Sequence, residues 1–108
     1  MKDITKQLKN RVSIESMVSA NGNSVPNQFI IYSAYGRMFR SYNSNVAFCP
    51  NDEPGKVYLG SDWDYSRTTM KYLNWFLNGQ TAAETRAKLD SGKYKLEPKL
   101  WLKNKCRI

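Results

Sequence analysis

Short segments rich in β-branched and aromatic side chains occupy the first half of the chain and predict strands. Residues 28–33 and 38–42 are two such segments, and a short turn containing Gly36 separates them, which predicts a hairpin. Residues 46–49 and 56–60 follow, with turns of Asn, Pro and Gly between the segments. Four short strands with short connections indicate an antiparallel meander, one face of which must be covered.

Two helices are predicted after these strands, and they supply the cover. The first begins after an N-cap at Asp64 or Ser66 and ends before Asn78-Gly79. The second opens at Thr81 with the sequence of a capping box and stops at Ser91-Gly92. The apolar stripe that turns the first helix toward the sheet consists of Thr69, Met70, Leu73, Phe76 and Leu77.

The two ends of the chain complete the expected organisation. Residues 1–20 carry apolar side chains at helical spacing in two stripes that do not share a face, which predicts a helical arm that bends near Ser13. Residues 94–96 alternate like one more edge strand before Pro98. The apolar positions of the arm are Ile4, Leu8, Val12, Ile14, Met17 and Val18.

We therefore expect one α+β domain over residues 1–108. It consists of an N-terminal helical arm (1–20), a core (27–92) and a basic C-terminal arm (93–108). The core is an antiparallel β-meander of three to five strands with two helices on one face. A chain of 108 residues and 12.5 kDa suits a single domain with one modest hydrophobic core.

Composition narrows the chemistry. The chain has 17 Lys and Arg against 9 Asp and Glu, a net charge of +8, and no histidine. The missing histidine excludes His-based catalytic triads, His general bases and imidazole-bound zinc. Asp62 and Asp64 are closely spaced, but a metal site needs further converging groups. We expect a protein that is not an enzyme and that uses no metal or cofactor.

The basic charge lies mainly at the C-terminal end. Residues 93–108 have a net charge of +5, whereas residues 21–92 have only +1. Cations interleaved with an indole indicate contacts to nucleic-acid phosphates and bases, and the alternative is a solubilising basic tail. The predicted nucleic-acid-binding residues of this arm are Lys93, Lys95, Lys99, Trp101, Lys103, Lys105 and Arg107.

A second basic and aromatic group is predicted on the first helix. Arg67, Lys71 and Trp75 recur at i, i+4 and i+8, opposite the apolar stripe. Such a ridge suits phosphates and stacked bases, and the alternative places Trp75 under the C-terminal arm. The start of this helix, with exposed amides and Arg67, also suggests an anion site, and the alternative assigns its polar residues to capping.

A third candidate surface lies on the predicted sheet. If the helices cover the side of Phe39, then Arg40, Tyr42, Lys56 and Tyr58 form an open aromatic and basic platform of the kind that binds single-stranded nucleic acid. The alternative is that these rings are ordinary strand aromatics in the core. A register error of one residue would exchange the two faces.

The chain carries no sequence signal for export or for a membrane. No apolar run long enough for a signal peptide or a transmembrane helix is present. Cys49 and Cys106 are expected to be free thiols in a reducing cytoplasm.

Two motifs carry a resemblance to a known family. An aromatic-x-Ser-Tyr-x-Ser segment, residues 39–44, follows the strand 27–31, and the run 63–69 reads Trp-Asp-Tyr-Ser-Arg-Thr-Thr. Together these motifs, over residues 27–77, resemble a family of small uncharacterised proteins encoded by bacteriophages and related mobile elements. The resemblance implies action in a bacterial cytoplasm, and it implies no catalytic residue.

These observations lead to two expectations about function. The first is a non-enzymatic phage accessory protein that binds nucleic acid or a ribonucleoprotein through the basic C-terminal arm. The second is a protein-binding inhibitor of a host defence or regulatory complex, in which exposed aromatic side chains make the main contacts.

Overall fold

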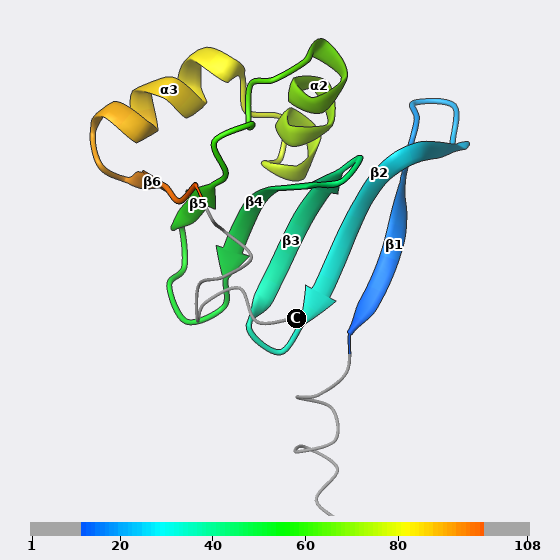
Figure 1. Cartoon of the computed structure of the whole chain (residues 1–108), viewed down its shortest axis with the longest axis horizontal. Helices are drawn as coiled ribbons and strands as arrows, with labels where there is room; N and C mark the ends of the chain where they lie inside the picture. The colour runs from blue at the N-terminus through cyan, green and yellow to red at the C-terminus, as the bar shows by residue number, and fades with distance from the viewer. Residues whose placement is uncertain (1–11, 99–108) are drawn as a thin grey trace, which may run out of the picture.

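Six strands form one sheet in the order β1-β2-β3-β4-β5-β6 (Figure 1). The computed structural model describes residues 12–98 of the chain. Neighbouring strands from β1 to β5 run antiparallel, and β6 is parallel to β5. The strands are β1 (Ser13–Val18), β2 (Ser24–Ser33), β3 (Gly36–Ser41), β4 (Ser44–Pro50), β5 (Val57–Leu59) and β6 (Tyr94–Leu96).

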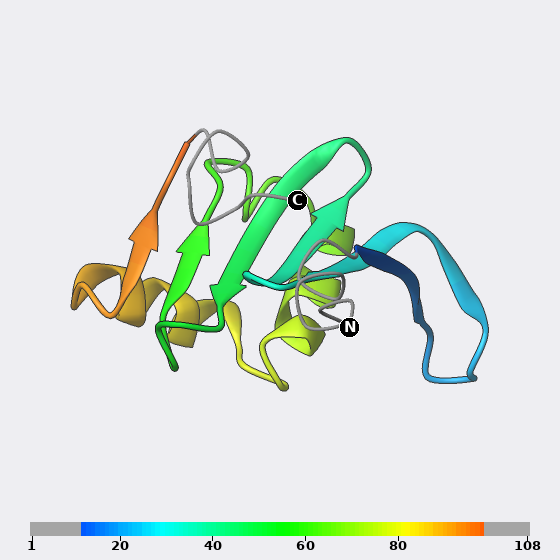
Figure 2. The same ribbon diagram turned by 90° about the horizontal axis from the view of Figure 1, so that it is seen from below.

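Helices α2 (Arg67–Phe76) and α3 (Ala82–Asp90) connect β5 to β6 and cover one face of the sheet (Figure 2). Two parallel neighbouring strands require such a crossover, whereas antiparallel neighbours need only a hairpin. Ser66 is the N-cap of α2, because its side chain accepts a hydrogen bond from the Thr69 N–H. Neither helix of residues 12–98 is long and apolar enough to cross a bilayer.

The main core lies between these helices and the sheet. The predicted apolar stripe of α2 is buried except for half-buried Met70, and Tyr72 joins it. The Phe76 ring stacks on Phe39 of β3 at 5.7 Å between ring centroids. Arg37, also on β3, places its guanidinium 4.6 Å from the Phe76 centroid and donates to the Phe76 carbonyl, which holds the C-terminal end of α2 on the sheet.

The expected fold class is wrong in two respects. Residues 13–18 of the predicted helical arm form β1 and pair with β2, and residues 1–11 lie outside the described chain. Ile14 and Met17, three positions apart, mimic helical spacing, but in a strand an odd separation puts them on opposite faces. The sheet also has six strands and is mixed, so it is not an antiparallel meander of three to five strands.

The predicted capping box of α3 is confirmed. The Thr81 side chain accepts from the Glu84 N–H, and the Glu84 carboxylate accepts from the Thr81 N–H. The hydrogen bond from the Thr81 backbone is the largest cause that lowers the pKa of Glu84, and the bond from the Thr81 hydroxyl is the next. The charge of Lys88 lowers this pKa further. The carboxylate is therefore part of what starts α3.

Replacing this carboxylate is expected to weaken the acid dependence of stability. Because the pKa of Glu84 is lower in the folded chain, its contribution is present at neutral pH and is lost as the pH falls through the folded-state pKa. Glu84→Gln should therefore show a smaller loss of Tm between neutral and acidic pH than the unmodified chain, as measured by circular dichroism. An unchanged acid dependence would contradict this role, and Glu15→Gln on the exposed edge strand is the control.

Candidate functional site

The two motif segments, far apart in sequence, meet at one end of the sheet. The Ser41 hydroxyl of β3 lies 2.9 Å from the Thr69 hydroxyl of α2, and Ser66 donates to Thr69 in turn. This chain of hydroxyls holds the β3–β4 turn against the start of α2. A cleft opens beside it, and we call it the turn cleft.

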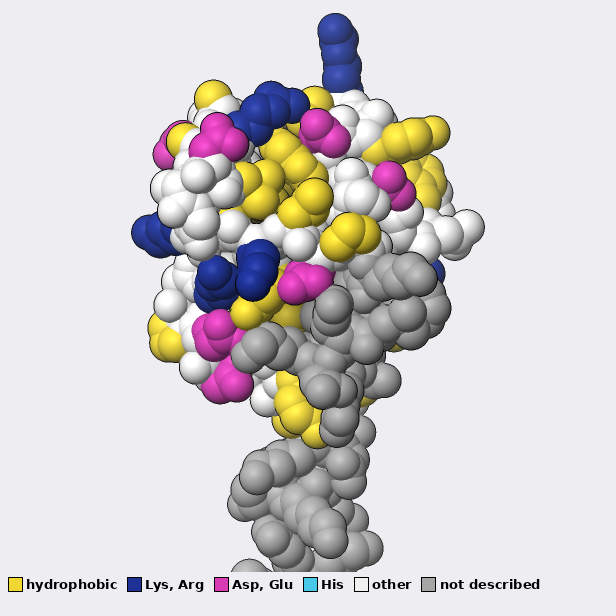
Figure 3. Space-filling model, turned by 60° about the vertical axis from the view of Figure 1, so that its left-hand side comes forward, with side chains coloured by type: hydrophobic (Ala, Val, Ile, Leu, Met, Phe, Trp, Pro, Cys, Tyr) yellow, Lys and Arg dark blue, Asp and Glu magenta, His cyan; other side chains and the backbone are white. Residues whose placement is uncertain are grey.

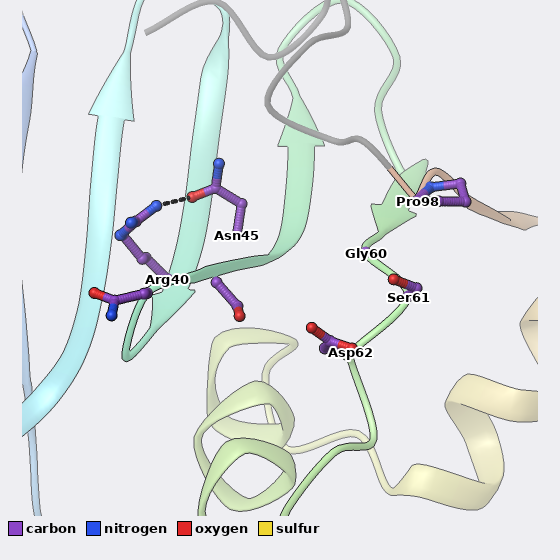
Figure 4. Close-up of a pocket in the computed structure, with 8 residues that line it drawn as sticks. Arg40, Asn45, Gly60, Ser61, Asp62 and Pro98 are labelled. Atoms are coloured by element: carbon purple, nitrogen blue, oxygen red, sulfur yellow. Dashed lines mark hydrogen bonds between the residues drawn. The ribbon is translucent and has the colours of Figure 1, made fainter.

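The turn cleft has a polar wall on each side (Figure 4). On one wall Arg40 Nη1 donates to Asn45 Oδ1 at 2.7 Å, and Ser61 and Asp62 form the opposite wall. This part has a volume of about 410 Å³, and an adjoining part of about 330 Å³ extends toward α2. The larger part is lined by Arg40, Asn43, Ser44, Asn45, Gly60, Ser61, Asp62 and Pro98. The adjoining part is lined by Ser41, Tyr42, Ser44, Val46, Asp62, Tyr65 and Thr69.

Gly60 explains how the second wall comes so close to the first. Its N–H donates to the Val46 carbonyl at 2.8 Å, so the segment after β5 stays bonded to β4. A Cβ atom at this position would lie 2.5 Å from the Asn45 carbonyl oxygen, which no side chain tolerates without a backbone shift. The glycine therefore sets the width of the turn cleft.

Two tyrosines line the part of the turn cleft nearest α2. Tyr65 is 81% exposed and Tyr42 is 53% exposed, although both are large aromatic residues. Tyr42 has a φ of 55°, which is rare for a bulky residue, and its N–H donates to the Asn27 carbonyl at 2.7 Å. The backbone thus holds an aromatic side chain in solvent at the cleft, where it is available to stack on a planar or sugar-like ligand.

The turn cleft is suited to binding. Its guanidinium, carboxylate, amides and hydroxyls supply donors and acceptors for a polar ligand.

Cys49, the free thiol of the described chain, lies outside the turn cleft. Burial raises the pKa of this thiol, although Arg37 opposes the effect. A thiol with a raised pKa is a poor nucleophile.

The basic and aromatic ridge predicted on α2 is present as an exposed surface. Arg67, Lys71 and Trp75 are all exposed on α2, and we call them the α2 ridge. Trp75 is 39% exposed, and its ring packs edge-on against Tyr72 at 5.4 Å between centroids. Lys71 Nζ lies 5.4 Å from the same Tyr72 ring. Because Tyr72 is buried, the ridge rests on a fixed support.

At the start of α2, Ser66 is a cap as the alternative to an anion site expects, whereas Asp64 is not a cap. The Ser66 hydroxyl already accepts from the Thr69 N–H. Asp64 pairs with Arg86 of α3 at 3.2 Å, and the Arg86 guanidinium lies 5.2 Å from the ring of buried Trp63. The Asp64–Arg86 pair therefore connects the segment before α2 to α3.

The four sheet-face candidates do not form one open platform. The helices do cover the side of Phe39, and Arg40 and Tyr58 point to the other face, as expected. Tyr58, however, is buried, and its hydroxyl donates to the Glu53 carboxylate. Tyr42 belongs to the turn cleft, and Lys56 donates to the Gly92 carbonyl.

The C-terminal arm is described only in part. Lys93 and Lys95 are exposed beside and within β6. The other predicted contacts, Lys99, Trp101, Lys103, Lys105 and Arg107, lie outside the described residues. Residues 12–98 contain no group of three or more His, Cys, Asp or Glu side chains that could hold a metal ion.

The turn cleft is the feature that sequence reasoning did not find. Its residues come from β3, β4, the segment after β5 and the chain beyond β6, so no local pattern joins them. The sequence signal that could have found the cleft is that its residues Ser41, Tyr42 and Tyr65 belong to the two motifs. These three side chains differ in burial. Ser41 is buried and structural, whereas the tyrosines are exposed.

Comparisons with known proteins identify a family without a known activity. No curated protein matches the chain, and no solved structure matches it. A family model described as "Family of unknown function (DUF8033)" matches residues 12–92, which include β1 to β5, both helices, the α2 ridge and most of the turn cleft. The chain therefore belongs to this family of unknown function, DUF8033.

Proposed function

We propose that this chain is a non-enzymatic accessory protein that binds nucleic acid or a ribonucleoprotein, with the α2 ridge as its contact surface on the described domain. The observation that carries the proposal is the ridge itself, in which two cations and a half-exposed indole lie along a helix with no carboxylate. Cations attract phosphates, and an indole stacks on a base of any sequence. The exposed Tyr65, two positions before Arg67, extends the aromatic surface.

The charge distribution supports two contributions to binding. Residues 12–98 carry nine Lys and Arg against eight Asp and Glu, and the face in Figure 3 shows both signs interspersed. Residues 1–11 and 99–108 carry the remaining net charge of +7. We infer that these two segments attract a polyanion at long range, and that the α2 ridge makes the contacts that depend on bases.

The chemistry of the domain supports binding without catalysis in a reducing compartment. The chain has no histidine, and its described thiol, Cys49, is unpaired with a raised pKa. A free thiol is typical of a cytoplasmic protein. With the resemblance to bacteriophage proteins, this favours action in a bacterial cytoplasm.

A salt titration tests the proposal. Fluorescence anisotropy with labelled single-stranded DNA, double-stranded DNA and RNA should show binding whose log K falls with log salt, by about 0.7 per phosphate contact for a single strand. The expected slope is about −2 or steeper between about 50 and 200 mM salt. Polyglutamate serves as the control for charge alone. Absence of binding to every nucleic acid at the lowest salt would overturn the proposal.

The exposed tyrosines of the turn cleft favour a second candidate, an inhibitor that binds a host defence or regulatory complex. Tyr42 and Tyr65 are the kind of aromatic side chains that dominate protein interfaces, and the described domain is nearly neutral. Purification of the chain from a host lysate after nuclease treatment distinguishes the two candidates. A partner retained by the chain but lost by Tyr42→Ala/Tyr65→Ala would support the inhibitor, and loss of every partner on nuclease treatment would contradict it.

A further inference from the structure

A row of apolar side chains crosses the face of the sheet that the helices leave free. The register pairs Ile14 with Ile31, Ile31 with Met38, Met38 with Phe48, and Phe48 with Tyr58, one residue from each of β1 to β5. Side chains paired in register point to the same face, so these five side chains form one continuous apolar row.

The exposure of the row changes along its length. Met38 and Phe48 are 0% exposed, Ile31 and Tyr58 are 8% exposed, and Ile14 at the β1 edge is 64% exposed. Both helices of residues 12–98 lie on the opposite face (Figure 2). Consecutive residues of the central strands are buried, such as Ala47 and Phe48 of β4, which is the pattern of a sheet covered on both faces. The row therefore requires a cover over β3, β4 and β5.

We propose that the segment 99–108 of this chain is that cover, and that it docks through Leu100, Trp101 and Leu102 on the apolar row. The described chain ends at Pro98, which lines the turn cleft with Arg40 and Asn45. Arg40 points to the same face as the row, because it pairs with Phe29 two positions from the Ile31–Met38 pair. The segment thus starts at the rim of the face that needs a cover.

Length and composition both suit this occupant. The ten residues after Pro98 can reach about 33 Å when extended, and the strands from β5 to β2 span about 15 Å at 4.8 Å per step. Three large apolar side chains in succession match an apolar strip, because removing apolar surface from water is favourable.

The burial gradient argues against the N-terminal segment as the cover. Residues 1–11 join the described chain at β1, beside Ile14, and Ile14 is the most exposed member of the row. The buried members Met38, Phe48 and Tyr58 lie on β3, β4 and β5, away from β1, and β5 is the neighbour of β6, after which Pro98 follows. If the segment docks in this way, Trp101 stabilises the fold, and the cations of the same segment stay free to bind a polyanion. The docking does not depend on the proposed function.

Oxidation of Met38 tests the docking in the full chain. Hydrogen peroxide oxidises exposed methionines, and mass spectrometry follows each residue separately. In the unmodified chain Met38 should resist oxidation. In Leu100→Asp/Trp101→Asp it should oxidise about tenfold faster or more, because the cover opens, while Met17 in the core under the helices stays protected. Trp75→Asp, the same change on the outer side of α2, should leave Met38 protected.

Loss of Met17 protection would show that the Leu100→Asp/Trp101→Asp variant is unfolded. A second measurement, which does not use this variant, then tests the docking. We expect a nuclear Overhauser effect between the Met38 methyl group and the Trp101 ring. The sample is the chain without substitutions, carrying isotope labels at these two residues. Unchanged Met38 protection in a folded Leu100→Asp/Trp101→Asp variant would overturn the docking. Met38 protection that rises with protein concentration would overturn it as well, because a second copy would then be the cover.

Discussion

Gly36→Ala is expected to destabilise the domain by about 3 kcal/mol or more, a large part of the stability of a small domain. A Cβ atom at Gly36 would lie 2.2 Å from the Cys49 carbonyl oxygen and 2.9 Å from the Pro50 Cα. Both atoms are backbone of the paired strand β4, so they have no rotamer through which to move away. The φ of 152° adds backbone strain for any residue with a Cβ. Urea unfolding followed by circular dichroism measures the loss.

Gly55→Ala separates the close contact from the backbone angle. Gly55 also has a positive φ, 82°, but no atom lies within 4 Å of the place where its Cβ would stand. Its substitution should therefore cost only about 1 kcal/mol, the strain of a left-handed residue. If both variants lost the same free energy of unfolding, the close approach of β3 to β4 would not be the reason that position 36 requires glycine.

Local patterns in the sequence predicted much of the fold. The capping box at Thr81, the apolar stripe of α2 and the hairpin of β2 and β3 each depend on residues close in sequence, and the structure confirms each of them. The parallel pairing of β6 with β5 depends on where two helices return the chain, which no local pattern encodes. β1 was missed because the spacing of Ile14 and Met17 suits a helix as well as an edge strand.

The candidate sites show the same division. The α2 ridge was predictable, because residues four positions apart on a helix share a face whatever lies around it. The sheet platform was only half predictable. Strand alternation placed Arg40 and Tyr58 on the helix-free face, but it did not indicate that Tyr58 is buried there. The turn cleft joins residues 40–45 with residues 60–62 and with Pro98, so its existence follows from tertiary packing alone.

Removing the α2 ridge is expected to cause the largest loss of nucleic-acid binding that the described domain can show. In Arg67→Gln/Lys71→Gln/Trp75→Ala, loss of stacking alone should weaken single-strand binding by about 1–3 kcal/mol, roughly 5- to 150-fold. Loss of two cations should make the salt slope shallower by about 1.4. The fold should persist, because all three side chains are exposed, and circular dichroism checks this.

A matched variant decides whether that loss belongs to the ridge or to charge alone. Lys56→Gln/Arg86→Gln/Tyr35→Ala removes the same charge and one exposed aromatic ring from other parts of the domain. It should keep the affinity within a few-fold, because long-range attraction comes mainly from residues 1–11 and 99–108. If the two variants lost affinity equally, binding would depend on net charge, and the α2 ridge would not be the contact surface. A loss confined to the ridge variant would place the bases on Trp75 and the phosphates beside Arg67 and Lys71.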